Sequence, residues 1–143
     1  MATNRTAEVV WTGDLMKGSG TIGTVTSGAF GPLDVSWASR SEEPNGKTSP
    51  EELIAAAWAS CFSMALSAGL GKAGTPPVRL ETSVTVTFQP GEGIIKGALS
   101  VKGTVPGVDA AGFQEAAEGA KANCPVSKAL AGIPEITLDA RLA

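Results

Sequence analysis

The chain has 143 residues, of which 43% are hydrophobic and 17% charged, and it carries a formal net charge of −3. This composition is typical of one soluble globular domain of ordinary size, and it excludes disordered and collagen-like chains. The 11 basic and 14 acidic side chains include no two adjacent basic residues, so no positive field is available to collect phosphates. We therefore expect a single domain over residues 1–143 without a nucleic-acid partner.

The chemistry available to a catalyst is narrow, because the chain has no histidine and no tyrosine. A Ser-His-Asp triad, a Cys-His dyad and a histidine-ligated zinc site are thereby excluded. We also expect no cofactor, because the sequence lacks ligand clusters for a metal or haem. The two cysteines, Cys61 and Cys124, are too few for a disulfide scaffold. The N-terminal segment lacks the apolar stretch of a secretory signal, so we expect a cytoplasmic protein, in which a cycling cysteine pair is usually catalytic.

The first part of the chain predicts a three-stranded antiparallel meander. Strand patterns occupy 8–11, 21–26 and 33–39, and glycine-rich breaks separate them. Connections this short permit hairpins but cannot supply parallel crossovers.

A long helix is predicted to follow. Ser49 is the expected N-cap, Pro50 the first helical residue, and Glu52 completes a capping box. The segment 53–71 carries no charge and approaches the length of a membrane span, but its small residues and serines favour a helix buried on all sides in a soluble protein without a membrane partner. Since one domain of this size cannot readily enclose such a helix, we predict a homodimer in which the alanines let two helices approach closely.

The remainder of the chain predicts further strands and helices, which together give an α+β fold. In chain order these are a hairpin of strands 78–89 and 94–105, a helix over 109–122 with Asp109 as N-cap, a short helix that opens at Cys124, and a strand over 135–142.

The two cysteines differ in their local setting. Cys61 lies in the middle of the long helix, so by default it is a small buried hydrophobe, inert unless a cation is brought to it. Cys124 precedes Pro125 at a helix start, where unpaired N–H groups favour a thiolate, although a weak cap that happens to be cysteine is an equally good interpretation. The pair together suggests a peroxidatic and a resolving thiol.

Two motifs carry a resemblance to a known family. The segment 49–67, SPEELIAAAWASCFSMALS, resembles the central-helix motif of the OsmC/Ohr family of thiol-dependent hydroperoxide reductases. The segment 122–130, ANCPVSKAL, resembles that family's second cysteine motif. The likeness covers essentially the full chain in element order, and it is greater to the osmotically inducible protein C branch.

The resemblance implies a fold in which antiparallel β-sheets pack around a long buried central helix, in an intertwined homodimer. It also implies the reduction of organic hydroperoxides, with Cys61 as the peroxidatic cysteine, Cys124 as the resolving one, and a lipoyl-type or small-molecule dithiol as reductant. The family activates its first thiol with an arginine and a glutamate, which match Arg40 and Glu51 best. The organic hydroperoxide resistance branch takes its arginine from the N-terminal hairpin, which here offers only Lys17.

The roles of Arg40 and Glu51 can be checked against simple geometry. Ten residues of helix span about 15 Å, so Glu51 cannot touch Cys61 on the same helix and must act through Arg40 or in the partner subunit's site. An arginine about 4 Å from Cys61 would favour its thiolate and could hydrogen-bond the leaving peroxide oxygen. The plainer interpretations are an exposed arginine at a strand end and helix-dipole compensation by Glu51.

The expected reaction is attack of the Cys61 thiolate on an organic hydroperoxide, followed by condensation of the sulfenic acid with Cys124 to a disulfide. Apolar neighbours such as Trp58 and Phe62 would favour alkyl or lipid peroxides, unless they are ordinary core. One alternative is thiol–disulfide exchange without peroxide. Another is a non-enzymatic, stress-related small-molecule-binding protein with structural cysteines.

Overall fold

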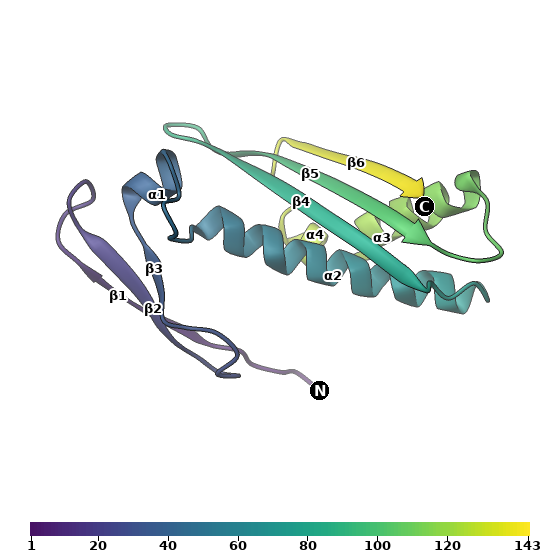
Figure 1. Cartoon of the computed structure of the whole chain (residues 1–143), viewed down its shortest axis with the longest axis horizontal. Coiled ribbons are helices and arrows are strands. Elements are labelled where there is room, and N and C mark those ends of the chain that lie inside the picture. Colours follow the sequence, from purple (N-terminus) through teal and green to yellow (C-terminus); the bar gives the residue numbers. More distant parts are fainter. The chain divides into compact units, whose positions relative to one another are not determined.

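The computed structural model describes all 143 residues, Met1–Ala143, and the chain forms two compact units, 1–53 and 54–143. The boundary falls inside the helix α2 (Pro50–Lys72), whose first turn belongs to the N-terminal unit. Figure 1 shows the elements of both units in chain order.

The N-terminal unit contains the predicted meander. Its three strands are β1 (Ala7–Thr12), β2 (Ser19–Val25) and β3 (Leu33–Val35). They pair antiparallel in the order β1-β2-β3, as the short glycine-rich connections required. Every residue of β1 is exposed, so this small sheet has little apolar core of its own.

The third strand is shorter than the predicted 33–39, because a helix begins after Val35. Ser36 caps α1 (Trp37–Ser41): its hydroxyl accepts from the Ser39 N–H at 3.1 Å, and the Ser39 hydroxyl accepts from the Ser36 N–H at 3.0 Å. Such reciprocal bonds satisfy backbone donors that a strand would have paired elsewhere. Arg40 therefore lies in a short helix and not at a strand end.

The predicted start of the long helix is confirmed. The Ser49 hydroxyl accepts from the Glu52 N–H at 3.2 Å, as expected of the N-cap. The Glu52 carboxylate accepts from the Thr48 hydroxyl at 2.8 Å and not from the Ser49 N–H, so only one half of the predicted capping box forms. By length and composition alone α2 would pass as a membrane span, a criterion that the core helix of a soluble protein also meets.

The C-terminal unit is built on a mixed sheet of order β4-β5-β6. Its elements are β4 (Arg79–Gln89), β5 (Gly93–Thr104), α3 (Ala110–Asn123), α4 (Pro125–Ala129) and β6 (Glu135–Leu142). The predicted hairpin β4–β5 is antiparallel, whereas β6 runs parallel to β5. The sheet thus differs from the expected antiparallel one, because α3 and α4 supply a connection long enough for a parallel crossover.

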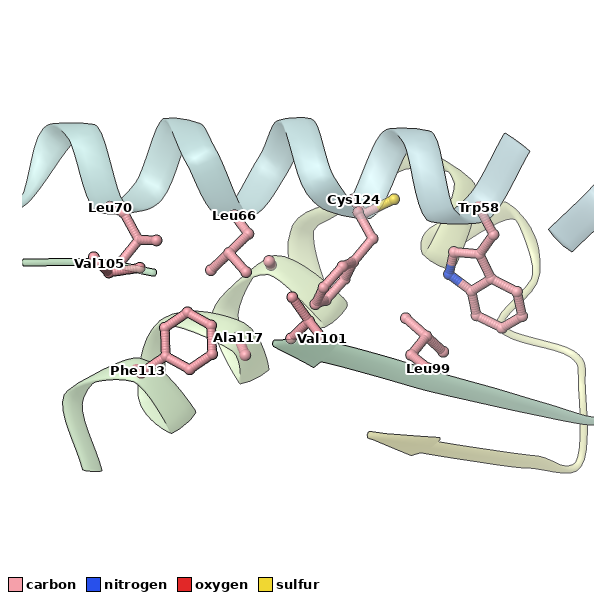
Figure 2. Close-up of a cluster of buried hydrophobic side chains, with 11 residues drawn as sticks. Trp58, Leu66, Leu70, Leu99, Val101, Val105, Phe113, Ala117 and Cys124 are labelled. Atoms are coloured by element: carbon pink, nitrogen blue, oxygen red, sulfur yellow. The ribbon is translucent and has the colours of Figure 1, made fainter. Parts of the chain in front are cut away.

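The core of this unit lies between α2, α3 and one face of the sheet. Trp58, Phe62, Leu66 and Leu70 recur every fourth residue along α2 and are at most 1% exposed. Figure 2 shows the side chains of α2 directed towards those of β5 and α3. The opposite face of α2 is open in the single chain, with Met64 72% exposed. The predicted burial on all sides requires a second subunit and stays a prediction.

Candidate active site

The fold of the C-terminal unit brings the two cysteines together. Cys61 comes from the middle of α2 and is partly buried, while Cys124, at the junction of α3 and α4, is 0% exposed. Both are free thiols, and each lies close enough to the other to shift its pKa. Residues far apart in sequence therefore form one dithiol site, which is the arrangement that disulfide formation requires.

The environments of the two thiols push their pKa values apart. Burial raises the pKa of Cys61, and the hydrogen bond that it shares with Cys124 raises it further. Burial alone would also raise the pKa of Cys124, but hydrogen bonds from Cys61, from the backbone and hydroxyl of Ser127 and from the backbone of Val126 hold it below its ordinary value. The hydrogen bonds around Cys124 therefore favour its thiolate, whereas the burial of Cys61 favours its neutral thiol.

A buried hydrogen bond that the sequence analysis missed adjoins Cys124. The Trp58 indole Nε1–H donates to the Ser127 hydroxyl oxygen at 2.7 Å, and both residues are buried. In Figure 2 the nitrogen of Trp58 lies on the side of its ring that faces Cys124. One sequence signal could have found Ser127: it is the third residue after the N-cap Cys124, a position that N-cap side chains commonly approach.

In the N-terminal unit, Arg40 and Glu51 form a two-point ion pair. Arg40 Nε donates to Glu51 Oε1 at 2.8 Å, and Arg40 Nη2 donates to Glu51 Oε2 at 3.1 Å. The Glu51 side chain is only 8% exposed and that of Arg40 32%. Glu51 is therefore a buried partner of Arg40, and the two bonds fix the plane of the guanidinium. Lys17, in contrast, lies exposed in the turn between β1 and β2.

No group of three or more His, Cys, Asp and Glu side chains is placed to hold a metal ion. The cysteine pair offers thiol redox chemistry. The Arg40–Glu51 ion pair offers a cation whose orientation is fixed. The ion pair belongs to the N-terminal unit and the dithiol to the C-terminal unit.

Comparison with known proteins identifies the family to which this chain belongs. The family described as OsmC-like protein matches residues 43–139. Peroxiredoxin OsmC of Escherichia coli (strain K12) is 42% identical over 145 residues, which cover 99% of each chain. The chain belongs to the OsmC-like family.

Two further relatives extend the comparison. The organic hydroperoxide resistance protein OhrA of Bacillus subtilis (strain 168) is 35% identical over 106 residues, 70% of this chain and 72% of that protein. The crystal structure of the organic hydroperoxide resistance protein OhrB of Bacillus subtilis shares the fold with a TM-score of 0.63 and 25% identity, over 96% of this chain and 98% of that one. In this OsmC-like chain Glu51 and both cysteines lie within the matched residues, whereas Arg40 precedes them.

Proposed function

We propose that this chain is a thiol-dependent peroxidase that reduces organic hydroperoxides to alcohols, with Cys61 and Cys124 as its redox pair. One observation carries the proposal: the two cysteines of the chain meet as free thiols in one site. Relatives named peroxiredoxin OsmC and organic hydroperoxide resistance protein support the substrate class.

The proposed reaction has three steps. The Cys61 thiolate attacks the terminal peroxide oxygen, so that an S–O bond forms, the O–O bond breaks, and the alkoxide takes a proton and leaves as the alcohol. The Cys124 thiolate then attacks the Cys61 sulfenic acid; an S–S bond forms and hydroxide leaves, protonated to water. A dithiol reductant, of lipoyl type or a small molecule, reduces this disulfide by two exchange steps and is itself oxidised to a disulfide.

We assign the peroxidatic role to Cys61 because it is the more accessible thiol, Cys124 being 0% exposed. Its raised pKa makes Cys61 dependent on a positive neighbour. Arg40, oriented by Glu51, is the proposed positive neighbour. It acts on Cys61 either in its own subunit or in the partner subunit. A fixed planar guanidinium can stabilise the thiolate and donate to the departing oxygen at the same time.

The proposed assembly is a cytoplasmic homodimer in which both units act as one domain. Large apolar side chains are exposed at β1, with Val10 70% exposed, and on the open face of α2, at Met64. Exposed apolar surface of this kind marks interaction sites. The match to the OsmC-like family crosses the boundary between the units, which supports their acting together.

The proposal is tested by the consumption of cumene hydroperoxide with a dithiol reductant in wild type, Cys61→Ser and Cys124→Ser. We expect turnover in wild type, none in Cys61→Ser, and a single turnover that stops at the sulfenic acid in Cys124→Ser. Equal, negligible peroxide loss in all three would overturn the proposal. Reduction of a small disulfide substrate without peroxide loss would then indicate thiol–disulfide exchange, and inert thiols would indicate a binding protein with structural cysteines.

A further inference from the structure

We propose that Trp58 and Ser127 are positioning residues for disulfide formation: their hydrogen bond holds the short helix α4 against α2, so that Cys124 stays in place to bond with Cys61. The use of this disulfide in a peroxidase cycle rests on the proposed function. The disulfide itself can be formed and measured without any peroxide.

The hydrogen bond joins the two helices at the turns that carry the cysteines. Trp58 precedes Cys61 by three residues on α2, and Ser127 follows Cys124 by three residues in α4. Residues three apart on a helix lie on adjacent turns of the same face. The Trp58 indole Nε1–H donates to the Ser127 hydroxyl oxygen at 2.7 Å and thereby connects the surroundings of both thiols across 69 residues of sequence.

The helix α4 has few other means of keeping its position. It contains five residues, too few for a helix to be stable by itself, and the Cys124 side chain makes no cap hydrogen bond at its start. Val126 packs against the core, but apolar contact is not directional. Ser127 is the buried residue of α4, and it alone makes a side-chain hydrogen bond from this helix to another element. The orientation of α4 therefore depends on that bond.

The Trp58 end of the bond is fixed by the sheet. A Cβ at Gly97 of β5 would collide with ring atoms of Trp58, so the ring lies directly on the backbone of that strand. Figure 2 shows the ring reaching from α2 towards β5. Water cannot easily replace either partner, because Trp58 is 0% exposed and Ser127 only 7%. The sheet thus fixes the indole, and the indole fixes α4.

The bond is expected to matter more in the reduced chain than in the disulfide form. Two groups that are held in one geometry react without first losing their freedom of motion. If the bond to Ser127 is lost, α4 gains freedom in the dithiol, and disulfide formation must remove that freedom again. In the disulfide form the S–S bond itself ties Cys124 to α2. Loss of the hydrogen bond should therefore make the disulfide less favourable.

The first test measures the equilibrium between the dithiol and the Cys61–Cys124 disulfide in mixtures of reduced and oxidised dithiothreitol. Trp58→Phe keeps an aromatic ring but loses the N–H, and Ser127→Ala loses the acceptor. In each variant we expect the equilibrium constant for reduction to rise about tenfold, the size of effect that one lost buried hydrogen bond can produce. This corresponds to a reduction potential about 30 mV less negative.

A double variant and a matched control separate positioning from general loosening. Trp58→Phe/Ser127→Ala is expected to shift the equilibrium no further than either single variant, because both substitutions remove the same bond. Ser63→Ala removes a different bond of α2, in which the Ser63 hydroxyl donates to Thr82 at 2.8 Å, and is expected to leave the equilibrium unchanged. Circular dichroism identifies folded variants, and Trp58→Phe keeps the test decisive if Ser127→Ala does not fold. An unchanged equilibrium in the folded variants, additive shifts, or an equal shift in Ser63→Ala would overturn the proposal.

The second test follows the proposed reaction after one equivalent of cumene hydroperoxide. The Cys61 sulfenic acid, trapped with dimedone at successive times, should persist about tenfold longer in Trp58→Phe than in wild type, while its rate of formation stays the same. An unchanged lifetime would contradict positioning of Cys124. If the dithiothreitol equilibrium shifts but no peroxide is consumed, the positioning role stands and only the proposed function fails.

Discussion

Arg40 is held by an ion pair with Glu51 within the N-terminal unit. Its two bonds to Glu51 fix a planar donor, and the side chain of Glu51 is nearly out of reach of water. Unlike a carboxylate in a flexible surface pair, Glu51 can therefore set the orientation of its partner. The consequence for catalysis can be tested with single substitutions.

We predict that Glu51→Gln lowers kcat/KM for an organic hydroperoxide about tenfold or more, because the amide cannot hold the guanidinium by two charged bonds. Arg40→Lys should lower it further, about a hundredfold, because an ammonium cannot reproduce the planar fork. Steady-state kinetics measure both. Glu52→Gln is the matched control, since that carboxylate accepts from Thr48; an equal loss in the control would contradict a specific role for Glu51.

The opposite pKa shifts of the two thiols predict opposite pH dependences of stability. In Cys61→Ser, where the introduced hydroxyl takes the place of the Cys61 thiol as hydrogen-bond donor to Cys124, the free energy of unfolding should rise with pH between the lowered pKa of Cys124 and the ordinary value of 9.0, because the folded state loses its proton first. In Cys124→Ser, it should fall as pH rises above 9.0 towards the raised pKa of Cys61, because the unfolded state loses its proton first.

Urea denaturation at a series of pH values, with a phosphine reductant present, measures both trends. The double variant Cys61→Ser/Cys124→Ser provides the baseline, since it retains all other titrating groups. Parallel curves for all three chains would show that neither thiol is perturbed by folding.

At the scale of elements, the contact between α2 and β5 depends on glycine. A Cβ at Gly97 would meet the Trp58 ring, whereas nothing lies within 4 Å of a Cβ at Gly119 in α3. We predict that Gly97→Ala destabilises the fold by about 1–3 kcal/mol through overpacking. Gly119→Ala should stabilise it by up to about 1 kcal/mol through helix propensity. Chemical denaturation of both variants provides the comparison, and equal effects would mean that the Trp58 ring can shift.

Elements were predictable from the sequence where a local signal agreed with the fold. Ser49 and Asp109 cap their helices as the sequence indicates. The segment 36–39 was mispredicted, because the alternation of Leu33, Val35 and Trp37 continues the strand pattern while the capping bonds of Ser36 favour a helix. Alternation cannot separate these outcomes, since it does not report where backbone donors are satisfied.

At the scale of the whole molecule, the proposed homodimer has a direct consequence. We predict a solution mass of about twice 14.4 kDa by light scattering. Met64→Asp should shift the population towards monomer, because a charge would replace an apolar contact on the open face of α2. Glu118→Gln, an exposed substitution on α3, is the control. A monomeric wild type would remove the dimer from the proposal.

The sequence by itself determined the element types outside the segment 36–39, the absence of imidazole chemistry and the two cysteine motifs, because composition, caps and short motifs are local properties. Only the tertiary structure decided which groups meet: Cys61 with Cys124, Trp58 with Ser127, and Arg40 with Glu51. It also decided the surroundings of each thiol, which raise the pKa of Cys61 and lower that of Cys124. The physical reason is that burial and hydrogen bonding are set by neighbours in space, and for Cys124 those neighbours come from both α2 and α4.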